Sequence, residues 1–304
     1  KNGAWSEYGD PRQNEGTGVS LGEGTSYYQR MTGQAGITYS NTFGKHFVEL
    51  LALGELNDYK SNAHSAYAKL LPFAELPELS FGQPTDGPIS GWSSAWRSAG
   101  YVFRARYNWD ERYLAEFTGR YDGSYKFAGM RKTRWGFFPS ASAAWNISKE
   151  PWMEGAAFLD DLKIRGSVAL LGNDLATSAY MYLKTFSPSS DVIYKPYNGN
   201  TTVNPSYAEN GVPNVDLTWE KQLSYNVGFD FGFLRDRITA GLDFYVRETT
   251  DMLNYVPVPA LSNLTNYLNS NIGSLVNKGF EFDVNAMVID TKDMTWSVGG
   301  NISY

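Results

Sequence analysis

The strongest constraint on the fold is a two-residue alternation that runs from Leu217 to Phe233. Its odd positions are apolar except for Lys221, and its even positions are polar or glycine. Successive side chains of a β-strand point to opposite faces, so this pattern predicts a strand with one apolar and one polar face. The same alternation recurs at 101–109, 113–121, 163–170, 237–247, 280–286 and 296–304. With further strands expected at 26–40, 45–55 and 135–147, the chain is predicted to be all-β with about ten antiparallel strands.

The connections between these strands alternate between short and long. In chain order they are 41–44, 56–98, 110–111, 123–134, 148–161, 173–216, 235–236, 249–276 and 289–293. One rim of the sheet therefore carries tight turns and the other carries long loops. Short periplasmic turns and long extracellular loops are typical of a transmembrane β-barrel of the outer membrane.

The polar face of the expected strands carries charges of both signs. In a membrane barrel this face would line a wet lumen and the apolar face would meet lipid, whereas in a soluble β-sandwich the apolar face would meet a second sheet. Aromatic residues are 15% of the chain, and they cluster at strand ends, which favours the barrel. Lys221 is the one charge on the apolar side. It is expected to lie above the lipid, near Trp219, which is expected to act as an interface anchor.

Several functional classes lack support in the sequence. The chain has no cysteine and only two histidines, His46 and His64, so no metal site and no cofactor are predicted. No convergent acid, base and nucleophile are visible, so an enzyme is not expected. The net charge of −6 argues against a nucleic-acid partner. No run of 18 apolar residues is present, so a transmembrane helix is not expected.

Several stretches resemble the SusC/RagA type of TonB-linked outer-membrane transporter of Bacteroidetes. They are RYLAEFTGRYDGSYKF (112–127), WGFFPSASAAWNISKEPWM (135–153), LDDLKIRGSVALLGN (159–173), LTWEKQLSYNVGFDFGFLRDRITAGLDFYVRETTDML (217–253) and NIGSLVNKGFEF (271–282). Order and spacing agree with that family from about residue 76 to the end. Tyr125 and Lys126 depart from it, since Ser and Arg are usual there.

The resemblance implies TonB-powered import of an oligosaccharide, or of a peptide in the RagA branch, across the outer membrane together with a SusD-like lipoprotein. It also implies that residues 1–304 are part of one β-barrel domain, about ten strands of a barrel with roughly 22. The plug domain, the TonB box and the last barrel strands are expected to lie outside this stretch. A barrel of that width holds a plug, so the inward charges are expected to face mainly the plug: Arg104, Arg106, Glu116, Arg120, Glu220, Asp230 and Glu281.

Cargo contact is then expected from the extracellular loops. The candidates are Tyr180, Tyr182, Tyr194, Tyr197, Asn198 and Asn200 in loop 173–216, because rings and amides can stack on a sugar or grip a peptide backbone. Trp92 and Trp96 allow two interpretations, either stacking on a sugar or anchoring the next strand at the membrane interface. Two other functions stay open, a passive porin-like channel and a secreted β-sandwich that binds glycan.

Overall fold

The computed structural model describes residues 19–71, 78–128, 133–155, 158–189, 193–194, 202–203, 206–209, 212–257 and 267–304. Tyr197, Asn198 and Asn200 lie outside these residues, and of Tyr194 only the backbone is described. None of the described helical segments is long and apolar enough to cross a membrane.

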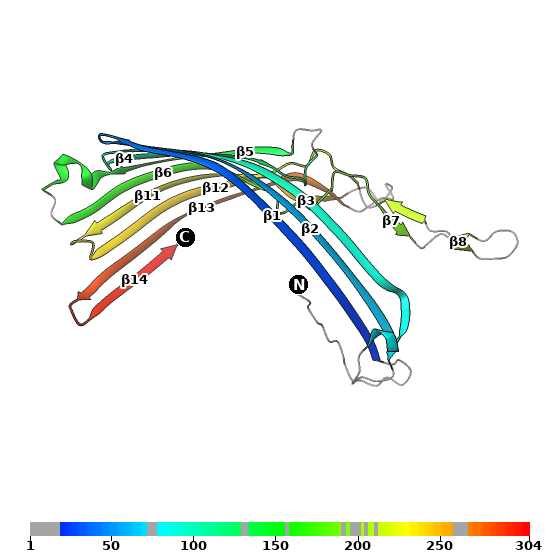
Figure 1. Ribbon diagram of the computed structural model, residues 1–304. Coiled ribbons are helices and arrows are strands. Elements are labelled where there is room, and N and C mark those ends of the chain that lie inside the picture. Colours follow the sequence, from blue (N-terminus) through cyan, green and yellow to red (C-terminus); the bar gives the residue numbers. More distant parts are fainter. Residues whose placement is uncertain are drawn as a thin grey trace. The chain divides into compact units, whose positions relative to one another are not determined.

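Ten strands form one sheet whose spatial order is their order along the chain (Figure 1). They are β1 (Val19–Phe43), β2 (His46–Leu71), β3 (Gln83–Trp109), β4 (Tyr113–Gly123), β5 (Trp135–Asn146), β6 (Leu159–Asn173), β11 (Glu220–Phe233), β12 (Ile238–Pro257), β13 (Tyr267–Asp290) and β14 (Thr295–Ser303). Between β6 and β11 lie β7 (Phe186–Ser189), β8 (Ile193–Tyr194), β9 (Thr202–Val203) and β10 (Ser206–Glu209), which pair as β7 with β10 and β8 with β9. Three short 3-10 turns complete the described elements: η1 (Leu79–Phe81), η3 (Ile147–Lys149) and η4 (Pro151–Met153). The predicted all-β fold with about ten strands is confirmed.

The chain divides into two compact units. Unit 1 comprises residues 1–33 and 55–98, and its described part is made of β1 up to residue 33, β2 from residue 55 and β3 up to residue 98. Unit 2 comprises residues 34–54 and 99–304, and it contains the other strands of the sheet.

The strand register in unit 2 gathers the apolar positions on one face. Phe229 of β11 lies opposite Ile164 of β6 and Leu242 of β12, and Leu242 lies opposite Phe282 of β13. Large side chains on this face are exposed, as Phe117 illustrates with 48% of its surface accessible. No second layer covers this face among the described residues, which is the opposite of a β-sandwich and suits contact with lipid.

Several strands are longer than the alternation predicted. β2 continues to Leu71 and β3 begins at Gln83, so most of the expected loop 56–98 is strand, and Trp92 and Trp96 lie within β3. The expected loop 249–276 shrinks likewise, because β12 ends at Pro257 and β13 begins at Tyr267. About 9–11 residues suffice to cross a membrane. Where a strand extends beyond that length, neither of its faces meets lipid. Its sequence there needs no apolar alternation, so it resembles the sequence of a loop.

The strand around Trp219 starts later than expected. β11 begins at Glu220, and Leu217 and Trp219 are buried against Phe127, with Phe138 packed beside them. The expectation that Trp219 anchors the chain in the lipid interface is therefore wrong, because its ring is covered by protein. Lys221 keeps its place on the apolar side and pairs with Asp251 at 2.9 Å.

The rim of tight turns depends on left-handed backbone. Asp110 and Glu111 connect β3 to β4 with φ of 54° and 56°. Leu234, Arg235 and Asp236 connect β11 to β12 with φ of 57°, 63° and 57°. Such residues cost roughly 1–2 kcal/mol each. The Asp160 carboxylate offsets part of this cost, since it accepts hydrogen bonds from the backbone N–H groups of Arg235 and Asp236.

Two rows of stacked aromatic rings cross β3, β4 and β5 on the apolar face. Near the tight turns Tyr113 stacks with Trp109 at 5.3 Å and with Trp145 at 6.1 Å between ring centroids. Towards the other end of the strands Trp135 stacks with Tyr101 at 6.2 Å and with Tyr121 at 4.9 Å.

The spacing of the two rows matches a membrane. Tyr101 and Trp109 are eight residues apart along β3, which is about 27 Å of strand. At the usual tilt of a barrel strand this corresponds to roughly 21 Å of height, close to the ~25 Å apolar band of outer-membrane barrels. The rows therefore have the spacing of the two aromatic girdles of such a barrel.

The row at the tight-turn rim is held by one carboxylate. Glu150, which precedes η4, accepts hydrogen bonds from the Tyr113 hydroxyl at 2.7 Å and from the Trp145 indole N–H at 2.9 Å. These two hydrogen bonds hold the pKa of Glu150 below its usual value, with the bond from Trp145 contributing most and the bond from Tyr113 next. The positive charge of Arg112 lowers this pKa further. Glu150 lies between the 3-10 turns η3 and η4, which fix this carboxylate at the rim.

Candidate functional site

The polar face of unit 2 carries two clusters of paired charges. In the first cluster Glu49 of β2 binds Arg104 at 2.9 Å and Arg106 at 3.6 Å, and Arg106 also binds Glu116 of β4 at 3.2 Å. Three strands therefore share one network, and each of its arginines faces a carboxylate. Glu49 was not singled out from the sequence; the only signal was one acidic residue within an apolar run, His46 to Gly54.

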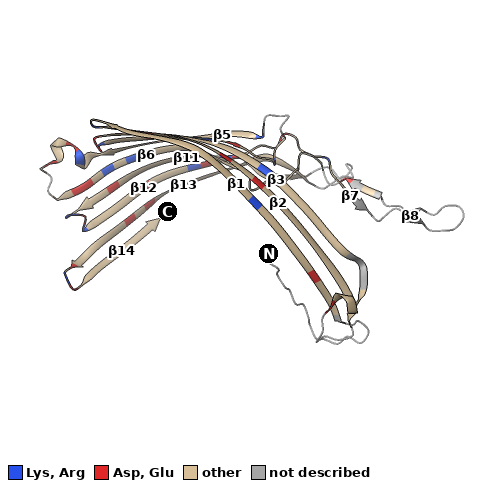
Figure 2. Ribbon diagram, in the orientation of Figure 1, with Lys and Arg blue, Asp and Glu red and all other residues tan. Residues whose placement is uncertain are grey.

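The second cluster joins β6, β11 and β12 through Arg165. Its guanidinium donates to both carboxylate oxygens of Asp243, at 2.8 and 2.6 Å, and to Asp230 at 3.1 Å. Lys163 lies 3.5 Å from Asp230. Figure 2 shows Lys and Arg in blue and Asp and Glu in red along β6, β11 and β12.

A glycine makes the second cluster possible. Gly228 of β11 lies directly between Arg165 of β6 and Asp243 of β12. A Cβ at this position would lie 2.5 Å from Arg165 Cζ and 2.8 Å from Asp243 Oδ1. Because Gly228 has no side chain, the guanidinium reaches across a whole strand to its partner.

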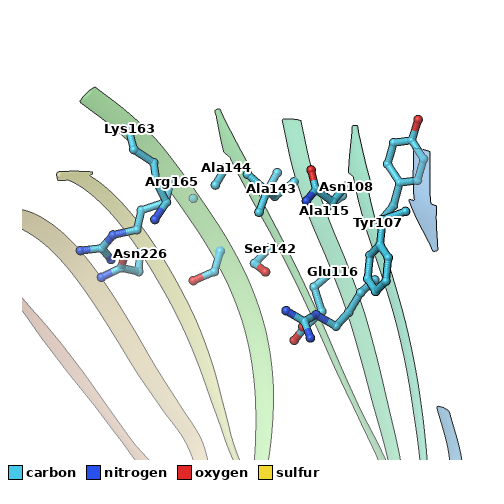
Figure 3. A pocket seen from close by; sticks show the side chains of 15 residues that line it. Tyr107, Asn108, Ala115, Glu116, Ser142, Ala143, Ala144, Lys163, Arg165 and Asn226 are labelled. Carbon is cyan, nitrogen blue, oxygen red and sulfur yellow. The ribbon is translucent and has the colours of Figure 1, made fainter. Parts of the chain in front are cut away.

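A shallow cavity of about 380 Å³ lies between the two clusters. Figure 3 shows Glu116 on one side, Lys163, Arg165 and Asn226 on the other, and the short Ser142 side chain between them. Its walls thus offer both signs of charge around a floor of small residues. Such a recess suits a polar surface, because an apolar occupant would leave these groups without water or partners.

The seven inward charges expected from the sequence divide into separate groups. Arg104, Arg106 and Glu116 belong to the first cluster and Asp230 to the second. Arg120 pairs instead with Asp122 of its own strand through two hydrogen bonds of 2.8 and 2.7 Å. Glu281 lies opposite Asp243 in the register.

Glu220 has a structural role at the start of β11. It is 8% exposed and accepts hydrogen bonds from the Asn173 amide at 2.9 Å and from the Leu253 backbone N–H at 2.8 Å. Both of its oxygens are thus occupied by neighbouring segments, and little of the side chain faces any cavity.

The long connection between β6 and β11, in its described part, places Tyr180 and Tyr182 beside Tyr125, which follows β4. Tyr180 lies 6.0 Å from Tyr125 in an edge-on arrangement and 6.4 Å from Tyr182. Burial and the nearby Asp174 charge raise the pKa of Tyr125. The connection is fixed below this group, because Lys126 donates to the Asp174 carbonyl at 2.7 Å and Ser124 to its carboxylate at 2.6 Å.

Trp92 and Trp96 lie in unit 1, on β3. Trp92 is 58% exposed, whereas Trp96 stacks on Tyr59 of β2 with 5.1 Å between ring centroids.

An antiparallel sheet with an exposed apolar face, two aromatic rows and a charged opposite face defines the wall of an outer-membrane β-barrel. The chain belongs to the TonB dependent receptor-like β-barrel family, whose model matches residues 1–304. The members of this family are transporters of the outer membrane and not enzymes.

Two relatives and one solved structure locate the chain within the family. The TonB-dependent receptor SusC of Bacteroides thetaiotaomicron is 39% identical over 204 residues, which are 67% of this chain and 20% of that protein. The TonB-dependent receptor P3 of Formosa agariphila is 30% identical over 295 residues, 95% of this chain and 28% of that protein. The RagAB peptide importer in its closed-closed state matches with a TM-score of 0.82 and 23% identity, over 94% of this chain and 30% of that chain.

These matches confirm the resemblance to the SusC/RagA type. The chain spans 20% and 28% of the length of the two relatives. The RagAB match concerns the fold alone.

Proposed function

We propose that the protein imports an oligosaccharide or peptide nutrient across the outer membrane with energy from TonB and together with a SusD-like lipoprotein. In this proposal residues 1–304 are part of one β-barrel domain. The observation that carries it is the pairing of an exposed apolar face with a charged, recessed opposite face in unit 2. One face suits lipid and the other suits a polar interior.

The edges of the sheet support the idea of a larger barrel. β1 and β14 each have a neighbour on one side only within the described sheet. The unpaired N–H and C=O groups of such an edge cannot be left in lipid, so each edge needs a further strand. A barrel of roughly 22 strands would supply these partners and would be wide enough for a plug.

The charge clusters suit a plug better than cargo. Both clusters consist of mutually paired residues around a recess, so they present a fixed polar surface to a folded partner. Cargo contact is assigned to the extracellular side, where Tyr180 and Tyr182 offer rings above the fixed base of the long connection. A SusD-like lipoprotein would cover this side.

Energised uptake separates this proposal from a passive channel. The full-length protein, with its own plug and TonB box, is expressed in a Bacteroidetes host and supplied with a labelled cognate nutrient. Deleting the TonB box is expected to lower uptake at least tenfold at unchanged surface expression, because release of the plug needs TonB. Undiminished uptake would mean a passive pore.

The same assay tests the assignment of the long connection. Removal of residues 180–209, which include Tyr180, Tyr182 and the paired strands β7 and β10, is expected to reduce uptake while heat-modifiable barrel mobility stays normal. Normal uptake by this variant would move cargo contact to other residues.

A further inference from the structure

In unit 1 three strands bring one cation and two aromatic rings together. The rings of Tyr59 on β2 and Trp96 on β3 stack with 5.1 Å between centroids and 22° between planes. The Arg30 guanidinium carbon on β1 lies 5.8 Å from the Tyr59 ring and 5.6 Å from the Trp96 ring. We call these three residues the Arg30 shelf. Distances below about 6 Å are those of a cation–π contact.

The three residues of the shelf lie on one face of their strands within unit 1, because their side chains meet there and alternate residues of a strand share a face. The neighbouring Thr32 and Asn57 share a hydrogen bond of 2.7 Å with the same parity as Arg30 and Tyr59. Asp58 and Arg97, of opposite parity, pair with each other at 2.8 Å.

The charge of Arg30 is not neutralised within the described residues. No carboxylate there lies within ion-pair distance of its exposed guanidinium, whereas Arg97, next to Trp96, has Asp58. A guanidinium that lies over aromatic rings uses its flat face, and its N–H donors point outward from its edge. The shelf therefore holds a fixed cation whose donors match a carboxylate or sulfate group.

The surroundings of the shelf are suited to sugars. Trp92 and Tyr28, which are 58% and 64% exposed, have the same strand parity as Trp96 and Arg30. The hydroxyls of Ser65 and Ser90 lie 2.7 Å apart, again with this parity. Exposed rings can stack on the apolar face of a pyranose, and serine hydroxyls can bind its hydroxyls.

We propose that the Arg30 shelf binds the acidic group of an anionic oligosaccharide, so that the cargo is a glycan with carboxylate or sulfate groups. The proposal rests on the proposed import function and narrows its substrate class. It explains why an arginine beside two aromatic rings has no carboxylate partner among the described residues, on a surface of hydroxyls and exposed aromatic rings.

The test uses the purified full-length transporter and a set of probes of equal length. The probes are oligogalacturonates, their methyl esters, sulfated galactans, neutral maltooligosaccharides and short peptides. The protein is expected to bind acidic oligosaccharides and to bind them more weakly as salt rises, because the contact is ionic and exposed. Arg30→Gln is expected to lower affinity for the acidic ligand at least tenfold and to leave any binding of its neutral ester unchanged.

Arg97→Gln is the matched control, since it removes a neighbouring arginine of opposite parity. It is expected to change the affinity for acidic ligand less than twofold. Preference for neutral glycans or peptides, failure to bind any acidic oligosaccharide, or equal effects of the two substitutions would overturn the proposal. If TonB-dependent uptake persists in such a case, the import function stands and only the acidic substrate class is refuted.

Discussion

Replacing Phe229 with arginine is expected to destabilise the assembled barrel by about 2–4 kcal/mol, the cost of a cation near the bilayer midplane. Phe229 lies between Ile164 and Leu242 in the register, so its neighbours on both sides are apolar. It is four residues from the end of β11 at Phe233, roughly half of the way across the apolar band. Urea titration of the folded full-length protein in detergent or lipid, followed by heat-modifiable mobility, measures the loss.

Thr239→Arg is the matched control for this substitution. Thr239 lies on the polar face of β12, between Gly232 and Asn285, where a long side chain has room. The unfolding midpoint of the Thr239→Arg variant is expected to stay near that of the wild type. Equal losses for the two arginine variants would mean that the inside and the outside of the sheet have been exchanged.

Replacing Arg165 with methionine is expected to cost about 1–3 kcal/mol, because it leaves two carboxylates without their main partner. The side chain of Asp243 is 19% exposed and that of Asp230 is 29% exposed, so water compensates only in part. Lys163 remains near Asp230, which makes Asp243 the residue most affected. The unfolding midpoint in urea measures this loss.

A double substitution distinguishes an ion-pair effect from a general packing defect. Arg165→Met combined with Asp243→Asn removes the uncompensated charge, so it is expected to be more stable than Arg165→Met alone. If Asp243→Asn instead adds its own full cost to that of Arg165→Met, the two residues are not coupled and the network does not stabilise the barrel.

The alternation revealed the strands where one face meets lipid and the other does not. Leu242 and Phe282 are apolar because they face lipid, and the sequence therefore displays them. The outer part of β2, which includes Asn57, Asp58 and Lys60, carries no such requirement and was read as a loop. Trp219 was misassigned because the alternation continues through it, although long-range packing against Phe127 removes it from the lipid face.

The inward charges could be assigned to one face but not to partners. Pairing depends on the register between strands, which is set by turn lengths and bulges that the alternation does not reveal. Arg165 and Asp243 are two strands apart, so their contact also requires that Gly228 be the residue between them. Arg120 has the apolar Val102 and Phe138 opposite it in the register, and it pairs with Asp122, two residues further along its own strand.

The central claim is that this sheet is a transmembrane wall with its tight turns in the periplasm and its long connections outside the cell. The sequence contains no cysteine, so single cysteines can be introduced at Tyr207, which is 69% exposed on β10, and at Asp236 in the tight turn. A membrane-impermeant maleimide applied to intact cells is expected to label the cysteine at 207 and to reach the one at 236 only after the outer membrane is disrupted. Labelling of position 236 in intact cells with protection of position 207 would contradict the claim.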